Sequence, residues 1–442
     1  MQILQIILAL SILVLIHELG HFTFARIFGI RIDKFFLFFD AGGFKLFSTR
    51  SPWFLKIFPK AAEWETEYGI GWLPLGGYCK VNGMIDESMD TEHLKNEPKP
   101  WEFRSKPAWQ RLLVMVGGVL FNFILGILIY SFSLYRWGEA YIPAEDSSIY
   151  VYEDSLADEM GFETGDIILA LDGHAPGEFY KIQIDMARDM VEVVTVLRGS
   201  DTLNIHIDQK HIADLLNTQL FDIAIPFIVQ DFTEKSLNKD SGLISGDRII
   251  SIDSTHIGFV QDALPILKSK AGHRITATVL RDSATMAVPL AVDTIGNIGV
   301  YFQAPDYRML SYSLLESIPA GCVKAYDATI GQIKDLRLLA KPSTGAYKSV
   351  GSIIAITDAM PQQWNWKLFL NILAMISIIL AVMNLLPIPA LDGGHIAFTL
   401  YEIITGRKPS DRFLMAMQLI GMILIFGLMF LAFGNDIARL LK

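Results

Sequence analysis

Two histidines and a glutamate stand within five residues near the start of the chain, in the order His17-Glu18-Leu19-Gly20-His21. Residues four apart lie on one face of a helix, so both imidazoles could bind the same metal ion. The glutamate between them could take a proton from water bound to that metal. This spacing predicts a zinc hydrolase site. The alternative is a pair of interfacial histidines beside a salt-bridged glutamate.

The motif belongs to an apolar stretch that runs from about Ile3 to Ile16 and continues weakly to Phe28. An ionisable group near the middle of a bilayer costs on the order of 2.5–3.5 kcal/mol. Three such groups so close together need a compensating function. Zinc provides one, because it binds neutral imidazoles and holds the carboxylate in a hydrated pocket. The membrane setting therefore favours a metal site.

A third metal ligand is expected from the segment Asn384-Leu-Leu-Pro-Ile-Pro-Ala-Leu-Asp392-Gly-Gly-His395. Catalytic zinc takes three protein ligands and leaves a fourth position for water. Prolines and glycines interrupt a helix here, which a membrane tolerates only where the backbone lines a cavity enclosed by protein. Asp392 is the candidate third ligand, and Asn384 could donate a hydrogen bond to a developing oxyanion. Alone, the segment would indicate only a helix that ends in an Asp-Gly-Gly cap.

Four apolar stretches must position these residues, and they cover about 3–28, 112–134, 368–388 and 413–433. The last three reach the ~20 residues that span a bilayer. The first lacks the positive segment and the small-residue cleavage site of a signal peptide, so we expect a retained transmembrane helix.

Lysines and arginines near the ends of these stretches predict the orientation. They occur at 26–34 and 104–111 around the first connection, and at 407–412 in the second. We expect both connections in the cytoplasm, and the two termini and the segment 136–365 outside it.

Composition agrees with a membrane protein that carries a large polar part. Of 442 residues, 52% are hydrophobic and 19% charged, and the mean hydropathy is +0.37. Soluble domains carry about 25% charged residues and a lower apolar share. A positive mean hydropathy over this length excludes disordered, collagenous and coiled-coil classes and disfavours a purely soluble enzyme. The net charge of −10 argues against a nucleic-acid partner. Two cysteines are too few for a disulfide framework.

The polar segment contains an internal repeat. Gly161–Asp172 matches Gly242–Asp253 at both glycines, both aspartates and one isoleucine, and Thr195–Arg198 recurs as Thr278–Arg281. The pattern of turn glycines, short strands and a helical stretch predicts two small α+β domains. They resemble the tandem PDZ modules of bacterial envelope proteases. Such modules could bind an extended peptide or act as a size filter, and both roles stay open.

The zinc motif and the segment from Asn384 to Asp392 together resemble the site-2 protease family of intramembrane zinc metalloproteases, in its bacterial, RseP-type branch. The resemblance covers nearly the whole chain in order. It implies a polytopic α-helical membrane protein with four transmembrane helices, two extracytoplasmic PDZ-like α+β domains and a membrane-associated β-hairpin. It also implies that His17, His21 and Asp392 bind Zn²⁺, that Glu18 is the catalytic general base and acid, and that Asn384 binds substrate or the oxyanion.

Two further segments resemble that family. Gly69–Val81 is similar to a membrane-re-entrant β-hairpin that pairs with the substrate, which implies substrate-binding roles for Gly76 and Gly77. The alternative is a buried cytoplasmic loop. Gly118 and Asn122 match a Gly-x-x-x-Asn pattern, and Asn122 is assigned to substrate binding. By itself that pattern indicates only close helix packing.

Two elements keep alternative interpretations. The connection 29–111 is unusually aromatic, and it could lie at the membrane interface or cover the active site. Tyr312 to Leu339 has apolar residues at helical spacing. It could pack on the second PDZ-like domain or lie as an amphipathic helix on the outer membrane surface.

The predicted transmembrane helices cover 1–28, which contains the zinc motif, 112–135, 366–390, which the third ligand follows, and 411–434. A cytoplasmic loop covers 29–111 and includes the hairpin at about 66–82. The PDZ-like domains cover 136–220 and 221–305, and an amphipathic helix with a connector covers 306–365.

The function implied by the resemblance is zinc-dependent hydrolysis of peptide bonds within or near the transmembrane segment of single-span membrane proteins. Expected substrates are anti-sigma factors or remnant signal peptides, first cut by another protease. The expected location is the bacterial inner membrane, with the active site towards the cytoplasm. The alternative is a non-catalytic membrane scaffold that binds peptides through its PDZ-like domains.

Overall fold

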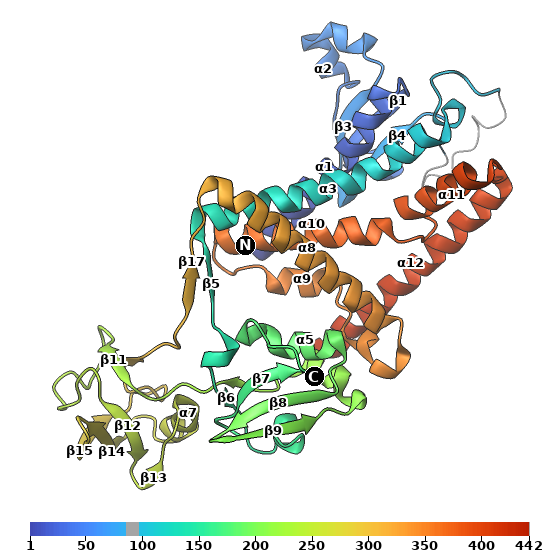
Figure 1. The fold of residues 1–442 in the computed structure, drawn as a ribbon. Helices are drawn as coiled ribbons and strands as arrows, with labels where there is room; N and C mark the ends of the chain where they lie inside the picture. The colour runs from blue at the N-terminus through green and yellow to red at the C-terminus, as the bar shows by residue number, and fades with distance from the viewer. Residues whose placement is uncertain (85–96, 442) are drawn as a thin grey trace. The chain divides into compact units, whose positions relative to one another are not determined.

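The computed structural model describes residues 1–84 and 97–441, which form two compact units (Figure 1). The first unit joins residues 1–139, 311–340 and 347–442, and the second joins 140–310 and 341–346. The first unit holds the predicted transmembrane helices and the zinc motif. The second holds the internal repeat. Each unit is described by itself.

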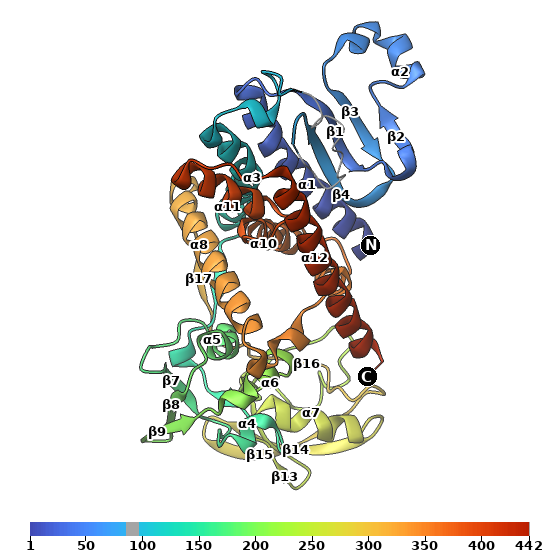
Figure 2. The ribbon, with the colours of Figure 1, turned by 90° about the vertical axis from the view of Figure 1, so that its right-hand side faces the viewer.

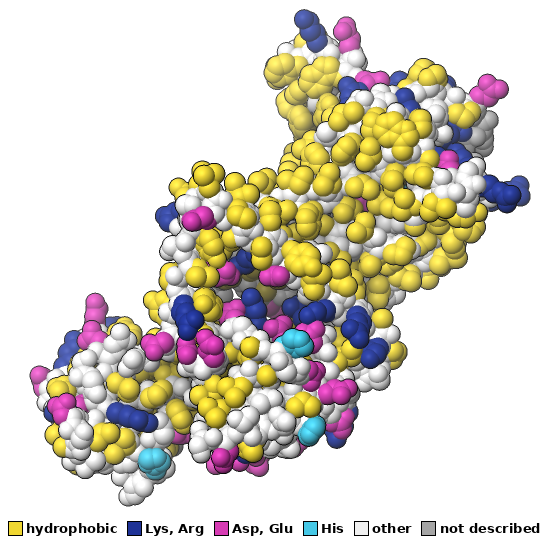
Figure 3. Space-filling model, in the orientation of Figure 1, with side chains coloured by type: hydrophobic (Ala, Val, Ile, Leu, Met, Phe, Trp, Pro, Cys, Tyr) yellow, Lys and Arg dark blue, Asp and Glu magenta, His cyan; other side chains and the backbone are white. Residues whose placement is uncertain are grey.

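Among the described residues, four helices are long and apolar enough to cross a membrane, and they fall where the sequence predicts four spans. Figure 3 shows hydrophobic side chains over much of the visible face of this helical unit. Apolar side chains of these helices, such as Leu128 and Phe430, are more than half exposed, as expected for lipid-facing positions. The four helices are α1 (Gln2–Ile27), α3 (Ala108–Trp137), α10 (Trp366–Leu385) and α12 (Asp411–Leu440).

Helices α1 and α3 are in backbone contact beside the zinc motif. A Cβ atom added to Gly117 would lie 2.6 Å from the carbonyl oxygen of Gly20 and 2.7 Å from the ring of Phe24. Glycines therefore permit the close approach, as small residues commonly do between membrane helices. Further along α1, Leu13 is fully buried in a cluster with Phe369 of α10. These contacts hold the histidine face of α1 towards α3 and α10.

A four-stranded sheet follows α1, and its strands are β1 (Ile32–Phe39), β2 (Lys45–Ser48), β3 (Glu67–Gly71) and β4 (Leu73–Val81). They lie in the order β2-β3-β1-β4 (Figure 2). The predicted hairpin at 66–82 is therefore wrong, because its two strands do not pair with each other. They flank β1, which pairs in parallel with β3 and antiparallel with β4. Only Trp72 separates β3 from β4, and Leu73 already pairs with Phe39 at the end of β1. In the chain, α2 (Pro52–Ile57) lies between β2 and β3.

The physical reason for this order lies in β1 itself. Its run of aromatic and apolar residues suits a central strand that is covered on both faces. Phe36 is buried within the sheet, and its ring stacks on Tyr78 of β4. An alternating pattern in 69–81 shows that a strand is present, but it does not identify the neighbouring strand.

Three shorter segments complete this unit: α8 (Leu314–Leu339), α9 (Ile353–Ala359) and α11 (Asp392–Thr405). Helix α8 packs on α3 and α10, where Ala325 is fully buried beside Tyr130 and Ile378. The two interpretations of this helix, packing on the second PDZ-like domain or lying on a membrane surface, both remain predictions. Helix α11 was not predicted as an element, and it begins at Asp392.

The second unit contains two similar modules. In the first, the strands are β6 (Ile149–Tyr150), β7 (Ile167–Leu171), β8 (Val193–Arg198), β9 (Asp201–His206) and β10 (Asp222–Ile223), with α4 (Leu156–Glu159), α5 (Ile182–Asp189) and α6 (Ile212–Asn217). In the second, they are β11 (Val229–Phe232), β12 (Arg248–Ile252), β13 (Thr255–His256), β14 (Arg274–Arg281), β15 (Ala284–Ala291) and β16 (Val300–Phe302), with α7 (Val260–Ser269). Two connecting strands are β5 (Glu139–Tyr141) and β17 (Arg308–Leu310).

The sequence repeat corresponds to a repeated ion pair. Arg198 donates to the buried carboxylate of Asp166 over 2.8 Å, and Arg281 donates to the buried Asp247 over 2.6 Å. Each guanidinium also donates to the carbonyl of the first repeat glycine, over 2.7 Å in one module and 2.8 Å in the other. The two segments are therefore equivalent in structure as well as in sequence. Their assignment as PDZ-like domains remains a proposal.

Candidate metal centre

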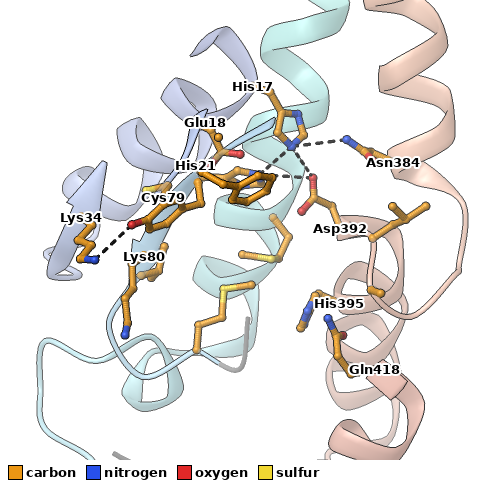
Figure 4. A pocket seen from close by; sticks show the side chains of 18 of the residues that line it. His17, Glu18, His21, Lys34, Cys79, Lys80, Asn384, Asp392, His395 and Gln418 are labelled. Atoms are coloured by element: carbon orange, nitrogen blue, oxygen red, sulfur yellow. Dashed lines mark hydrogen bonds and ion pairs between the residues drawn. The ribbon is translucent and has the colours of Figure 1, made fainter. Parts of the chain in front are cut away.

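His17, His21 and Asp392 converge within the first unit (Figure 4). The Nε2 atoms of the two histidines lie 3.2 Å apart. Oδ2 of Asp392 lies 3.2 Å from Nε2 of His17 and 3.4 Å from Nε2 of His21. The structure thus brings together the two histidines of α1 and the aspartate at the first residue of α11, which are far apart in the chain.

The triangle of ligand atoms fits a zinc ion. With metal–ligand bonds of about 2.0–2.1 Å, tetrahedral geometry places two ligand atoms about 3.3 Å apart. The three observed distances lie close to this value. Oδ2 of Asp392 is buried and has no hydrogen bond to any of the described residues. A buried carboxylate oxygen that faces two ring nitrogens is suited to a divalent cation.

Each imidazole is held through its other nitrogen by α3. Nδ1 of His21 lies 2.9 Å from the carbonyl oxygen of Val114. This nitrogen therefore carries the proton and donates, which leaves the Nε2 lone pair for a metal. Nδ1 of His17 lies 3.3 Å from the side-chain nitrogen of Asn122. Oδ1 of Asn122 is buried without a partner among the described residues. A half-turn of the amide would let Oδ1 accept the Nδ1 proton of His17 in the same way.

Gly118 explains why the histidines can lie against α3. A Cβ atom at this position would be 2.5 Å from Nε2 of His21 and 2.6 Å from Cε1 of His17. Every residue with a side chain would therefore displace the imidazoles. The Gly-x-x-x-Asn pattern thus has a specific use here: the glycine makes room for both rings, and Asn122, one turn later, contacts His17.

Glu18 lies beside the three candidate ligands and lines the same cavity, whose volume is about 450 Å³. Its carboxylate lies near the backbone of Cys79 in β4, which lines the cavity as well. The cavity volume is within the range of ligand-binding pockets. The arrangement can hold water, a general base and a peptide bond next to one metal ion.

Of the four predicted substrate-binding residues, two line the cavity and two do not. Asn384 lines the cavity, and its amide nitrogen lies 3.5 Å from Nε2 of His17. Gly77 also lines the cavity, and a Cβ there would be 2.7 Å from Cγ1 of Val14, so glycine lets β4 approach α1. Gly76 instead packs against the ring of Phe39. Asn122 is fully buried behind His17 and does not line the cavity.

One wall of the cavity is an open strand edge. The described residues pair β4 with β1 alone, so β4 is the edge strand of its sheet. Residues 77–81 of this strand line the cavity. An extended peptide could therefore add to the sheet directly beside the candidate metal centre.

Sequence reasoning missed several residues of this cavity. Asp40 accepts hydrogen bonds from Nζ of Lys34 over 3.1 Å and from the hydroxyl of Tyr78 over 2.8 Å. All three side chains line the cavity. Their proximity arises from the pairing of β1 with β4, which no local sequence pattern reveals. Gln418 of α12 was missed as well, although it is the one polar residue in the apolar stretch 413–433.

The chain matches peptidase family M50 over residues 5–428. It is 29% identical to the regulator of sigma E protease of Haemophilus influenzae, over 98% of each chain. It is 27% identical to the regulator of sigma-E protease RseP of Escherichia coli, also over 98% of each chain. A Neisseria meningitidis protein, named provisionally as a zinc metalloprotease, is 28% identical over 99% of each chain.

Proposed function

Because the chain belongs to peptidase family M50 and is an intramembrane zinc metalloprotease, we propose that it cleaves single-span membrane proteins within or near their transmembrane segments. The observation that carries this proposal is the convergence of His17, His21 and Asp392 beside the open edge of β4. The convergence occurs in the unit that contains four helices long enough to span a membrane.

His17, His21 and Asp392 would hold the zinc ion, with the fourth position left for water. When bound, zinc makes water acidic enough to act as a nucleophile at neutral pH and polarises the scissile carbonyl. Glu18 takes a proton from the attacking water and later gives it to the leaving amine nitrogen. The amide of Asn384 lies close enough to the centre to donate a hydrogen bond to the oxyanion.

The strand edge supplies the conformation that hydrolysis requires. In a helix, each carbonyl accepts a hydrogen bond from the residue four positions later, so a helical peptide bond is protected. β4 offers replacement hydrogen bonds to a peptide that has unwound into a strand. Since Gly77 to Val81 line the cavity, a strand added there passes the candidate zinc ligands and Glu18.

We further propose a setting for this reaction. The protein would lie in the bacterial inner membrane, with the active site towards the cytoplasm and with the two modules and both termini outside it. The basic residues at 104–111 and 407–412 support this orientation. As PDZ-like domains, the modules would exclude bulky ectodomains, so that substrates such as anti-sigma factors or remnant signal peptides arrive after a first cut.

A non-catalytic scaffold that binds peptides through the modules is the competing interpretation. It gives no role to three metal-ligating side chains within 4.8 Å of one another, nor to a cavity that contains Glu18 between them and an open strand edge. The catalytic interpretation uses each of these features.

The test is the Glu18→Gln variant of the full-length protein, reconstituted in vesicles with a single-span fusion substrate whose ectodomain has been shortened. Wild-type protein is expected to cut the fusion within its transmembrane segment, with the site mapped by mass spectrometry. Glu18→Gln should remain inserted and keep its zinc, but lose cleavage. Glu159→Gln, an exposed glutamate of the second unit, is the matched control. Unchanged cleavage by Glu18→Gln would defeat the proposal.

A further inference from the structure

Gln418 of α12 occupies the wall of the cavity that lies across from β4 (Figure 4). Only 4% of the residue is exposed, and its amide makes no hydrogen bond to any other described residue. Buried polar groups in folded proteins are nearly always hydrogen-bonded. An amide that belongs to a buried residue, makes no hydrogen bond to another described residue and lines a cavity is available to a ligand in that cavity.

The position of Gln418 is fixed by the packing of α12. Gly421 lies one turn later on the same helix face. A Cβ atom on Gly421 would overlap the backbone of Pro389, so α12 lies directly on the segment that precedes Asp392. At its other end, Asp436 accepts a hydrogen bond of 2.7 Å from the backbone of Ser352. Gln418 is thus anchored to the same structure that positions the candidate third ligand.

The ligand's chemistry follows from the geometry of a β-strand. Backbone N–H and C=O groups of a strand point alternately to its two sides. β4 can satisfy only the side of an added peptide that faces it. The groups on the far side point to the wall formed by α11 and α12, where Gln418 and His395 lie (Figure 4). If such a group stayed buried and unpaired, binding would weaken by about tenfold.

We propose that Gln418 binds the far edge of the substrate strand, so that β4 and α12 hold the peptide from opposite sides. This inference rests on the proposed function. Because a side-chain amide can both donate and accept, Gln418 can pair with the main chain whatever the substrate's side chains are. The ligand class is an extended, apolar peptide, recognised through its backbone.

The first experiment measures binding of a tetrapeptide hydroxamate, which attaches to zinc and extends as a strand, to the full-length zinc-loaded protein in detergent. Gln418→Leu is expected to lose about tenfold in affinity while keeping its zinc content, because the described hydrogen bonds and ion pairs of the three candidate ligands do not include Gln418. Ile420→Ala changes an exposed side chain on the opposite face of α12 and should bind as wild type does. Equal affinity of Gln418→Leu and wild type would overturn the inference.

A second experiment decides the matter if Gln418→Leu fails to fold or loses zinc. A photo-crosslinking amino acid is placed at 418 or at 420 in the Glu18→Gln background, together with the single-span fusion. We expect crosslinks to the transmembrane segment of the fusion from 418 and not from 420. Equal crosslinking from both positions would overturn the inference. Failure of the proposed function looks different, because wild-type protein would then neither cleave the fusion nor bind the hydroxamate.

Discussion

The Nε2 atoms of His17 and His21 lie 3.2 Å apart, while Nδ1 of each ring is turned to a group on α3. Two neutral imidazoles in this arrangement present two lone pairs to one point in space. Oδ2 of Asp392 completes the set from α11. The candidate centre thus depends on α3 as much as on the helix that carries the histidines.

Asn122 should act on zinc through His17. Asn122→Leu removes the group that faces Nδ1 of His17. Loss of such a partner typically lowers metal affinity 10–100-fold, and we expect a change of about that size. Asn122→Asp keeps an acceptor at the same place and should stay within a fewfold of wild type. Competition with a chelator of known affinity measures both. If the leucine variant binds zinc as tightly as wild type, Asn122 has no role in orienting His17.

Gly118 should tolerate no side chain. In Gly118→Ala, the new methyl group would stand 2.5 Å from Nε2 of His21. The ring must therefore move, and the distances from its Nε2 atom to the other two candidate ligand atoms change. We expect zinc affinity to fall at least tenfold and cleavage to fall with it. Gly427→Ala is the control, since nothing lies within 4 Å of a Cβ atom there. Full zinc occupancy and wild-type cleavage in Gly118→Ala would show that the rings do not rest on α3.

Gly77→Val should impair substrate binding and leave zinc binding unchanged. A valine at 77 would push β4 away from Val14 of α1 and from the backbone of Phe36. The three candidate ligands come from α1 and α11, so zinc content should not change. Cleavage of the single-span fusion should fall at least tenfold, because the strand edge no longer lies beside the centre. Gly177→Val, at an open position of the second unit, controls for the added bulk. If Gly77→Val cleaves the fusion as well as wild type does, β4 does not bind the substrate.

The second module should lose stability in acid. Hydrogen bonds from Arg281 hold the pKa of Asp247 below its usual value. A carboxyl group with a lowered pKa stabilises the fold above the pKa of the unfolded chain, about 3.9. That contribution disappears as the pH falls below about 4 and the carboxylate is protonated. Amide hydrogen exchange in β12 and β14, corrected for the intrinsic rate, should therefore quicken below pH 4.

The control for this pH dependence is a pair of variants. Asp247→Asn removes the titrating group and should make the module less protected at neutral pH and less sensitive to acid. Asp240→Asn changes an exposed carboxyl group and should behave as wild type. An acid sensitivity that persists undiminished in Asp247→Asn would assign it to another group.

The sequence predicts those parts of this protein that depend on local spacing. Hydropathy locates four spans because lipid demands long apolar helices, and helical periodicity places His17, Glu18 and His21 together. Asp392 is separated from the histidines along the chain, so residue spacing made it a candidate and only the fold brings it to them. The repeat in the second unit was readable because its turn glycines and buried aspartates recur at fixed offsets.

Strand pairing and the far wall of the cavity were not predictable in this way. Two apolar strands separated by one residue suggest a hairpin, and only long-range packing shows that β1 lies between them. Gln418 did leave a signal, since a single amide in an apolar span is costly unless it has a function. Its place beside the candidate zinc ligands, however, depends on the contact of Gly421 with Pro389.

Metal analysis of purified His21→Ala beside wild type tests the central claim most directly. If His17, His21 and Asp392 form the centre, wild-type protein holds about one zinc ion per chain, and the alanine variant loses it while its helix content stays the same. Full zinc retention in a folded His21→Ala protein would contradict the account.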